Sequence, residues 1–473
     1  MPPLLASMPI ETQNRAPGLT RRAFLQTSTK AAAAAAVALD VSRFAHAQGS
    51  DVLRVGLVGC GGRGAGAALQ ALTADPGARL VAMCDIFLDR VQAKLAKIRE
   101  ARPDQVQVDA DHCLTGFGAY QKVIEASDVV LIANAAKFHP VQMLAAIQAG
   151  KHVFVEKPHA IDPAGIKVVR AACDLAREKR LCVVSGLQSR YHPGIAETVQ
   201  RIHDGEIGDV VAIEENFLRA PYVIVQRDPK LSELQYQCST QYHFNWLSGD
   251  DVTQSLVHNF DRASWVLGNQ TPLKCHGLGG RSSMTAEEYG NVFDHHSVVY
   301  EFPNGVRMYG FCRTTTGCYD ESSSIVLGAK GRASVARCEL RGARRWRWEG
   351  KADAYQIEHE RLFAAIRAST PLNNGDYMAN STLIAIMGQI SCYTGKEVTW
   401  EQITQSNFHF PPKPEDCHDD MEPPVRPGPD GTYPVYIPGQ TVLLETPAPP
   451  GQTPAAKAPA EGANSSSGTP PSR

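Results

Sequence analysis

A glycine-rich stretch between residues 59 and 64 has the spacing of a phosphate-binding loop. It reads GCGGRG, follows an apolar run at 53–58 and opens a helix-like segment. In that setting the pattern GxGxxG predicts a dinucleotide site. Its first glycine permits a tight turn, its second lets the backbone approach a pyrophosphate, and its third lets the helix pack closely. The start of the helix adds free N–H groups and partial positive charge. The predicted contacts are Gly59, Gly61, Gly62, Arg63 and Gly64.

An acidic residue at the end of the next apolar run bears on which dinucleotide is bound. Asp85 stands 21 residues after Gly64. Its carboxylate would accept hydrogen bonds from the adenosine ribose hydroxyls and would repel a 2′-phosphate, which favours NAD over NADP. Arg63 and Arg90 are cations near enough in sequence to leave NADP open.

The tripeptide Glu156-Lys157-Pro158 follows a later apolar run, at 152–155. In open parallel sheets, ligands bind at the carboxyl ends of the strands. A lysine there, partly desolvated and near a positively charged nicotinamide ring, would have its pKa lowered toward a range useful for acid–base chemistry. From the tripeptide alone, a surface Glu–Lys pair at a strand end is the commoner explanation.

A polar stripe marks the segment 250–268, which has the pattern of a helix. At about 100° per residue, its polar members lie within about an 80° arc, apart from most of the apolar residues. The stripe is either a solvated face or the face of a pocket, and a lone histidine in it is more often structural than catalytic. Its members are Asp251, Gln254, His258, Asp261 and Trp265.

The elements that would position these groups alternate between strand and helix up to about residue 187. Short runs rich in Val, Ile and Leu, separated by helical segments, predict a doubly wound parallel sheet. The strands are expected at 53–58, 80–84, 128–133, 152–155 and 181–185, the last of these as the sixth strand of the series. The helices are expected at 65–74, 89–101, 117–126, 140–149 and 163–178.

Longer β-prone runs begin after about residue 209, at 210–217, 296–302, 306–313 and 324–327. Pro303-Asn304-Gly305 lies between two of them and predicts a hairpin. The expected fold is therefore α/β: an N-terminal Rossmann domain over 52–187, then an α+β domain over 188–400 with an open, largely antiparallel sheet.

The two ends of the chain differ from this body. Residues 1–47 have the pattern of a twin-arginine signal peptide, with Arg21-Arg22, a weakly hydrophobic core and Ala45-His46-Ala47 as a cleavage site. We expect export to the periplasm or beyond. Of the 31 prolines, 16 fall between 411 and 471, which predicts an extended strap over 401–445 and a disordered tail over 446–473.

Composition excludes several classes of protein. The 473 residues carry 47 basic and 49 acidic side chains, for a net charge of −2. Without a basic field, binding to nucleic acid is not expected, and no apolar run is long enough for a membrane span in the mature protein. The twelve cysteines form no CxxC, and the histidines show no HExxH spacing, so we expect no metal site.

Four features in this order resemble the Gfo/Idh/MocA family: GCGGRG after the first strand, Asp85 after the second, EKP after the fifth, and a histidine-bearing helix beyond the domain boundary. The resemblance covers about 52–400. It implies NAD(P)-dependent oxidation of a sugar, glycoside or polyol hydroxyl, with Lys157 polarising the substrate oxygen and His258 acting as general base. It also implies a homo-oligomer, a dimer or tetramer, formed through the second sheet.

The sequence departs from the family pattern at two places. An aspartate usually stands four residues before the histidine, and here that position is Gln254; Asp251 or Asp261 would have to substitute for its charge. The loop after the fourth strand reads Asn134-Ala135-Ala136 where Thr-Pro is more common, so Asn134 and His139 are expected near the cofactor or pocket. Glu156 is expected beside the cofactor as well.

Two other functions stay open at this point. A glycoside hydrolase of the same family would oxidise its sugar transiently with tightly held NAD, eliminate the aglycone and return the hydride. A non-catalytic sugar-binding protein would keep the fold without turnover, and Gln254 is the feature that favours it.

Overall fold

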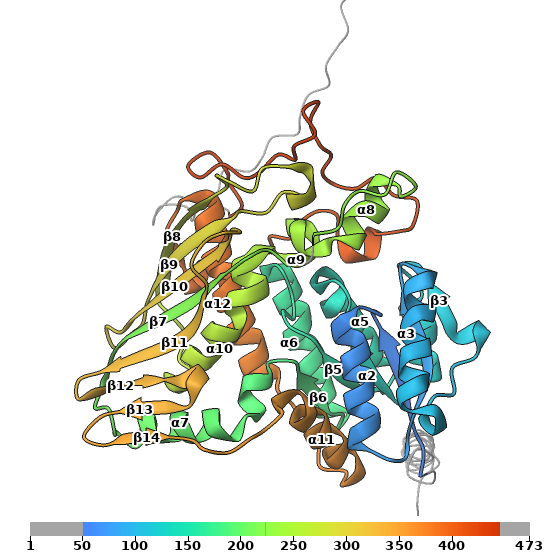
Figure 1. Ribbon diagram of the computed structural model, residues 1–473, viewed down its shortest axis with the longest axis horizontal. Coiled ribbons are helices and arrows are strands. Elements are labelled where there is room, and N and C mark those ends of the chain that lie inside the picture. Colours follow the sequence, from blue (N-terminus) through green and yellow to red (C-terminus); the bar gives the residue numbers. More distant parts are fainter. Residues whose placement is uncertain (1–50, 223, 445–473) are drawn as a thin grey trace, which may run out of the picture. The chain divides into compact units, whose positions relative to one another are not determined.

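The computed structural model describes residues 51–222 and 224–444. The predicted signal peptide (1–47) and the predicted tail (446–473) lie outside these residues. The remaining expectations fall on two sheets and the helices around them (Figure 1).

The first sheet is parallel and has the strand order β3-β2-β1-β4-β5-β6. This order reverses direction between β1 and β4, which is the switch point where open α/β sheets bind ligands. The central strands are buried almost throughout, as their Val, Ile and Leu content predicts. The strands are β1 (Leu53–Val58), β2 (Ala78–Asp85), β3 (Cys113–Thr115), β4 (Val129–Ile132), β5 (His152–Val155) and β6 (Val183–Ser185).

The helices that cross over this sheet match the expected positions within about three residues. They are α2 (Gly62–Ala74), α3 (Leu88–Ala101), α4 (Tyr120–Ala126), α5 (His139–Gln148) and α6 (Pro163–Glu178). The sequence reading missed β3, because three residues with no fully buried side chain carry no alternating or continuous apolar signal.

The second sheet has nine strands in the order β14-β13-β12-β11-β7-β10-β9-β8-β15. Every neighbouring pair is antiparallel except β7 and β10. The predicted hairpin is confirmed, since β9 and β10 pair across Pro303-Asn304-Gly305. The strands are β7 (Val210–Arg219), β8 (Lys274–Gly280), β9 (His295–Glu301), β10 (Arg307–Thr314), β11 (Glu321–Gly328), β12 (Gly331–Ser334), β13 (Glu339–Arg341), β14 (Arg345–Arg347) and β15 (Val398–Thr399).

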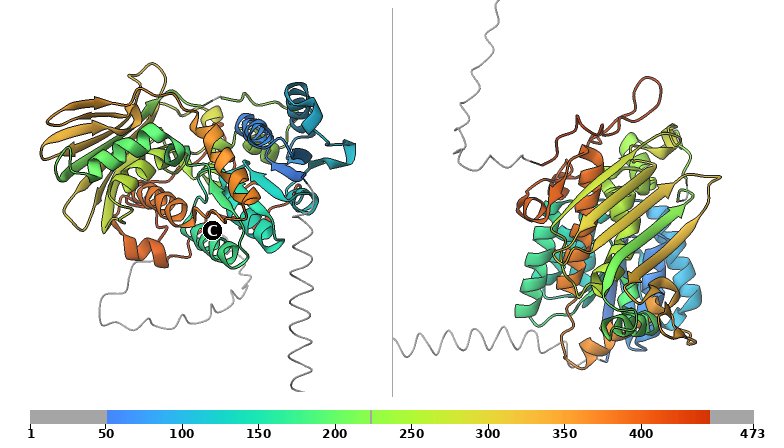
Figure 2. Two further views of the ribbon diagram at one scale, coloured as in Figure 1. Left: turned by 90° about the horizontal axis from the view of Figure 1, so that it is seen from below. Right: turned by 90° about the vertical axis from the view of Figure 1, so that its left-hand side faces the viewer.

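Helices cover one face of the second sheet and leave the other uncovered within the described residues (Figure 2). Two of the covering helices, α10 (Val257–Val266) and α12 (Gly375–Thr394), lie between the two sheets. They share one apolar core with both sheets, through residues such as Phe260 of α10 and Ile386 of α12. The helices of this half are α7 (Pro193–His203), α8 (Glu233–Ser239), α9 (Asn245–Ser248), α10 (Val257–Val266), α11 (Ala354–Arg367), α12 (Gly375–Thr394) and α13 (Trp400–Gln405).

The segment expected to be one regular helix over 250–268 is not regular. Val252–Leu256 forms a π-helical turn that leads directly into α10. A π turn takes up one residue more than an α turn, so side chains before it are rotated relative to those after it. The single arc predicted at 100° per residue was therefore wrong for this segment.

The extended strap expected from residue 401 starts later, because 401–405 belong to α13. Residues 406–444 run without long helices or strands, as their proline content predicts. Tyr433 and Phe410 are buried in an aromatic cluster with Phe244 and Tyr393. Ile437 and Val442, also in this segment, are exposed. Along the described part of the chain, no helix combines the length and apolar character needed to cross a bilayer.

Candidate active site

The loop between β1 and α2 leaves an open backbone surface. Gly59 has φ +94°, and a Cβ there would lie 2.5 Å from the backbone nitrogen of Asn134, so only glycine fits. A Cβ on Gly64 would lie 1.9 Å from the carbonyl oxygen of Gly59, so α2 packs directly on the loop. At Gly61 and Gly62, a Cβ would meet no described atom within 4 Å. This surface and the start of α2 fit a pyrophosphate.

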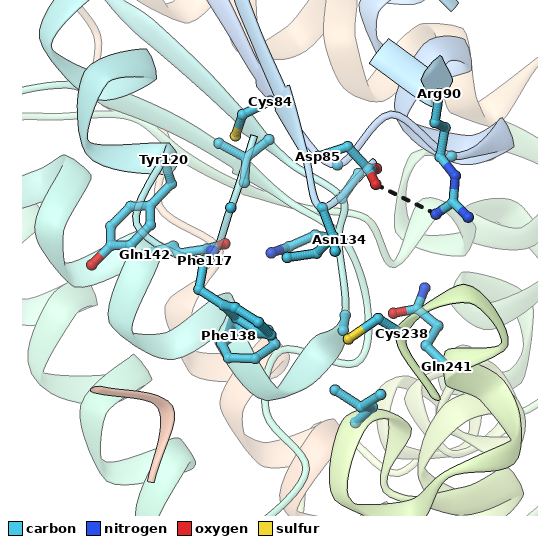
Figure 3. A pocket seen from close by; sticks show the side chains of 18 residues that line it. Cys84, Asp85, Arg90, Phe117, Tyr120, Asn134, Phe138, Gln142, Cys238 and Gln241 are labelled. Atoms are coloured by element: carbon cyan, nitrogen blue, oxygen red, sulfur yellow. Dashed lines mark hydrogen bonds and ion pairs between the residues drawn. The ribbon is translucent and has the colours of Figure 1, made fainter. Parts of the chain in front are cut away.

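A small cavity of about 90 Å³ lies beside this loop (Figure 3). Asp85 lines it from the end of β2. One carboxylate oxygen accepts the backbone N–H of Cys60 at 2.8 Å, and the other lies 3.5 Å from a guanidinium nitrogen of Arg90. The carboxylate stands where a ribose hydroxyl would need an acceptor, and Arg90 is the cation that a 2′-phosphate would need.

The opposite wall of this small cavity comes from the second half of the chain. Cys238, Gln241 and Leu247 line it from the segment 232–248. The strap contacts the same segment: the Tyr433 hydroxyl donates to Glu233 at 2.5 Å, and the Gln237 amide donates to the Val425 carbonyl at 2.7 Å. The strap thus anchors a cover over the predicted adenosine site.

A larger cavity of about 440 Å³ adjoins the first, and Asn134 lines both. Its size is in the range of small-molecule sites. Its walls come from both halves of the chain. The lining residues are Arg63, Ala133, Asn134, Ala136, Glu156, Lys157, Gln188, Phe217, Tyr222, Gln241, Tyr242, Ser248, Gln254, His258, Arg262, Ser322 and Tyr355.

Lys157 enters the larger cavity from the end of β5. Its Nζ donates to the backbone carbonyl of Gln254 at 3.0 Å, in the π turn. Burial lowers the pKa of Lys157, and the carboxylates of Glu156 and Asp251 oppose that shift only in part. The ammonium is therefore easier to deprotonate than that of a surface lysine.

His258 lines the same cavity from the first turn of α10. Burial, followed by the positive charges of Lys157 and Arg262, holds the pKa of His258 well below its usual range. The imidazole is therefore neutral near pH 7 and can accept a proton. Its Nδ1 is buried and hydrogen-bonds to no described residue.

Four buried polar atoms around the larger cavity lack a protein partner among the described residues. They are Asn134 Oδ1, Gln188 Oε1, His258 Nδ1 and Arg262 Nε. Buried polar groups are normally hydrogen-bonded, and those that are not call for a ligand or water. The cavity is therefore built for a polar ligand.

The three acidic or amide residues predicted on the helix, Asp251, Gln254 and Asp261, do not lie in one site. Gln254 lines the larger cavity with His258. Asp251 does not line it and instead accepts hydrogen bonds from Arg219 at 2.6 Å and Ser255 at 2.5 Å. Asp261 is fully buried and paired with Arg190. The structure thus brings neither aspartate to His258 in place of the family carboxylate.

Arg63 and Glu156 line the larger cavity but bind each other. The Arg63 guanidinium is hydrogen-bonded to Glu156 and pairs with Glu358 of α11 at 3.1 Å. It also lies over the Tyr355 ring, 4.8 Å from the centroid. Arg63 therefore joins the two halves of the chain, a role that its place in the glycine loop did not indicate.

His139 lines neither of the two cavities. Its ring nitrogens lie 2.8 Å from the carbonyl oxygen of Pro158 and 3.1 Å from that of Asn134. The buried ring holds the loop after β4 against the loop after β5. His139 thus helps to position Asn134 and Lys157 without lining either cavity itself.

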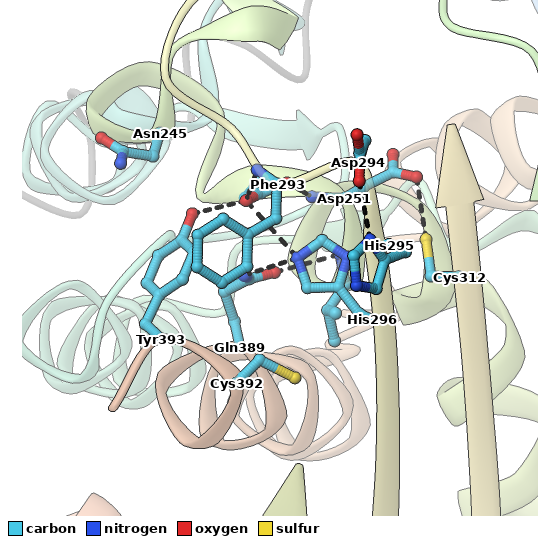
Figure 4. Close-up of polar contacts among 12 residues, drawn as sticks. Asn245, Asp251, Phe293, Asp294, His295, His296, Cys312, Gln389, Cys392 and Tyr393 are labelled. Carbon is cyan, nitrogen blue, oxygen red and sulfur yellow. Dashed lines mark hydrogen bonds and ion pairs between the residues drawn. The ribbon is translucent and has the colours of Figure 1, made fainter. Parts of the chain in front are cut away.

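A buried network fixes the turn that precedes the histidine (Figure 4). Asp250 accepts the Tyr393 hydroxyl at 2.6 Å and the Phe293 N–H at 2.8 Å. Gln389 of α12 accepts the Val252 N–H, the first of the π turn, at 3.1 Å. These contacts set the rotation that points Gln254 and His258 into the cavity.

Sequence reasoning missed several lining residues. Arg262 stands four residues after His258, which places it about 20° outside the predicted arc, and a wider arc would have included it. Gln188 follows the end of β6 and was detectable by the strand-end rule. The aromatic residues Tyr222, Tyr242 and Tyr355 carry no sequence signal. In the described residues, no group of three or more His, Cys, Asp or Glu is placed to hold a metal ion.

Residues 53–186 match a family model described as an oxidoreductase family with an NAD-binding Rossmann fold, Gfo/Idh/MocA. The Rossmann domain belongs to the Gfo/Idh/MocA oxidoreductase family. This match confirms the resemblance to the family, and GCGGRG, Asp85 and EKP lie within the matched residues. The chain is thus an NAD(P)-dependent oxidoreductase whose glycine loop and Asp85 fit the dinucleotide.

Relatives of this family extend the likeness beyond the Rossmann domain. Inositol 2-dehydrogenase of Salmonella paratyphi B is 26% identical over 333 residues, which is 67% of this chain and 87% of the relative. Two solved structures share the fold: aldose-aldose oxidoreductase from Caulobacter crescentus, complexed with glycerol, and levoglucosan dehydrogenase, complexed with NADH and levoglucosan. Each has a TM-score of 0.57 and 17% identity; the first covers 74% of this chain and 99% of its own, the second 73% and 99%.

Proposed function

We propose that this enzyme transfers a hydride between NAD and a hydroxyl of a sugar, glycoside or polyol. One observation carries the proposal: Lys157 from the Rossmann domain and His258 from the second domain line the same polar cavity, next to the dinucleotide loop. The relatives named for inositol, aldose and levoglucosan chemistry support the same substrate class.

His258 and Lys157 each have a definite task in the oxidation. NAD, when bound, supplies the acceptor for the hydride. His258 is neutral, so it takes the proton of the substrate hydroxyl. The Lys157 ammonium donates a hydrogen bond to the same oxygen and stabilises the negative charge that develops there. The π turn holds Lys157 in reach by accepting its hydrogen bond through the Gln254 carbonyl.

The test is hydride transfer from a panel of sugars to NAD in single and double variants. General acid–base groups contribute about 10²- to 10⁴-fold, so Lys157→Ala and His258→Ala should each lower turnover by such a factor. Affinity for NAD should stay within a few-fold. Because groups acting as a unit lose rate non-additively, the double variant should be little worse than either single one. Full turnover in His258→Ala would remove that residue from the mechanism.

The same panel distinguishes the other two functions. Release of an aglycone with no net NADH would indicate redox-assisted glycoside hydrolysis. Ligand binding without any oxidised product, in the enzyme with NAD bound, would indicate a binding protein.

We further propose that the enzyme is exported in the folded state with its cofactor bound. The twin-arginine pattern at Arg21-Arg22 supports this route, and the covered adenosine cavity suits a cofactor loaded before export. Changing both arginines to lysine should leave the protein in the cytoplasm. Unchanged delivery to the periplasm would reject the signal.

The uncovered face of the second sheet supports a homo-oligomer, a dimer or tetramer. Val211, Leu278 and Leu327 on this sheet are more than two-fifths exposed, and a second copy of the chain packed on the sheet would cover them. Leu278→Glu should lower the molar mass measured by light scattering. A monomeric mass for the parent enzyme would contradict the proposal.

A further inference from the structure

One cation in the larger cavity has no role in the proposed reaction. Arg262 lies one helical turn beyond His258 on α10, so both side chains share a face of the helix. It lines the cavity while remaining only 7% exposed. Phe217 of β7 and Ser322 of β11, which are directly opposite each other in the sheet, line the cavity too.

The guanidinium of Arg262 is poorly satisfied by the protein. Its Nη1 donates a long hydrogen bond to the Ser189 hydroxyl, at 3.4 Å. Its Nε has no hydrogen-bond partner among the described residues, and no described carboxylate lies within ion-pair distance of the guanidinium. A buried arginine is normally paired, because burying an uncompensated charge is costly.

Two carboxyl groups, those of Asp261 and Glu215, lie near enough to Arg262 to interact with its charge, but both are hydrogen-bonded to other residues. The Asp261 carboxylate accepts hydrogen bonds from Arg190, from Nε at 3.0 Å and from Nη2 at 2.9 Å, and it also accepts the Ser381 hydroxyl. Glu215 accepts from Asn259 at 2.9 Å and from Ser324 at 2.6 Å. Burial raises the pKa of Glu215 to about 8, so this carboxyl is largely neutral near pH 7.

The other charged residues that line the cavity do not neutralise Arg262 either. Glu156 is the acidic residue of the lining, and it is bound to Arg63. Lys157 adds a second cation that forms no ion pair with a described carboxylate. The cavity therefore presents an excess of positive charge to its ligand, in a low-dielectric setting where that charge is felt strongly.

We propose that the substrate is an acidic sugar, whose carboxylate or phosphate group binds the planar fork of Arg262 while the reacting hydroxyl lies between Lys157 and His258. Arginine is suited to this task, because its donors match both oxygens of an anionic group. The inference rests on the proposed function for the reaction, but the anion site itself is independent of hydride transfer.

The experiment compares matched neutral and acidic sugars on the enzyme with NAD bound. The probes are D-glucose, D-glucuronate, D-glucose 6-phosphate, D-galactose and D-galacturonate. Each is measured twice: for NADH formation, and for the shift in melting temperature that reports binding without turnover. The variants are Arg262→Gln, Arg262→Lys and, as a matched control, Arg344→Gln, an exposed arginine between β13 and β14.

In the parent enzyme, at least one acidic probe should bind and react about ten- to hundredfold better than its neutral partner. Arg262→Gln should remove that preference, Arg262→Lys should keep part of it, and Arg344→Gln should keep all of it. A preference for uronates assigns a carboxylate, and one for glucose 6-phosphate assigns a phosphate.

Three outcomes overturn the inference. The first is a neutral sugar that is used as well as its acidic partner. The second is an Arg262→Gln variant that loses neutral and acidic sugars alike, which would make Arg262 a structural or cofactor contact. The third is the absence of any thermal shift with the acidic probes. Binding of an acidic sugar that depends on Arg262 but yields no NADH would keep the anion site and reject the proposed function.

Discussion

His258 has no acidic partner in the cavity, although its family position calls for one. Gln254 stands four residues earlier and lines the same cavity. The present environment, burial with two cations nearby, lowers the pKa of His258. A base with a lowered pKa stays active at lower pH, but its protonated form is less stable once it has taken the proton.

We predict that Gln254→Asp raises the apparent pKa of the acid limb in the profile of kcat/KM against pH. The added carboxylate favours the imidazolium, so activity should begin to fall at a higher pH than in the parent enzyme. Steady-state rates between pH 4.5 and 9 measure the shift. Gln200→Asp, on the exposed face of α7, is the control and should leave the limb in place. An identical limb in both variants would mean that His258 is not the titrating base.

We predict that Asp85 determines the preference for NAD over NADP. A ribose 2′-phosphate would lose the hydrogen bonds to this carboxylate and meet its charge, and hydrogen bonds to charged groups are worth about 1.5–3 kcal/mol each. Asp85→Ala should therefore narrow the preference for NAD over NADP at least about tenfold. Binding of both dinucleotides is measured by fluorescence titration. An unchanged ratio would assign the selectivity elsewhere, with Arg90 as the first group to change.

At the scale of elements, the π turn Val252–Leu256 decides which side chains reach the cavity. It is held from α12, where Gln389 accepts the Val252 N–H. Its rotation turns Asp251 toward Arg219 and leaves Gln254 and His258 in the cavity. A regular α-helix through the same residues would present a different set of side chains.

We predict that Gln389→Met destabilises the enzyme and lowers kcat together. The Val252 N–H would be left buried without an acceptor, which costs about 1–3 kcal/mol. Relaxation of the turn would also move the Gln254 carbonyl away from Lys157. Thermal unfolding and steady-state kinetics test both effects, with Gln200→Met as the surface control. A loss of stability with kcat unchanged would show that the turn does not position the catalytic pair.

At the scale of the whole molecule, buried histidines contribute to the acid sensitivity. Burial lowers the pKa of His152 and His243 to about 4 and that of His159 to about 3. In the unfolded chain these groups titrate near 6.5, so between pH 6.5 and 4 the unfolded state binds more protons. The free energy of unfolding must therefore fall as pH falls through that window. The raised pKa of Glu215 acts in the opposite sense.

We predict that the melting temperature drops between pH 6.5 and 4 and that His159→Gln reduces the drop. His159 lies 2.9 Å from the hydroxyls of both Thr382 and Ser185, contacts that an uncharged amide can replace. Each unit of pKa displacement corresponds to about 1.4 kcal/mol. His418→Gln, an exposed position in the strap, should leave the pH dependence unaltered. An equal drop in the parent and in His159→Gln would contradict this account.

Local sequence was sufficient for the Rossmann half of the fold apart from strand β3. Apolar runs buried on both faces, glycines that open a turn and acidic or basic residues at strand ends are short-range signals. They located β1, α2, Asp85 and Lys157 without knowledge of the rest of the chain. The hairpin at residues 303–305 was equally local, because it depends on turn residues between two strands.

Only the tertiary structure decided how the cavity is completed. The π turn depends on Gln389, 137 residues away from Val252, and Arg63 is bound by Glu358, 295 residues along the chain. Arg262 matters because no described carboxylate pairs with it, and a sequence periodicity cannot predict a missing contact. Sequence patterns report neighbours along the chain, whereas pairing, burial and unpaired charge depend on contacts between segments that meet only in the folded state.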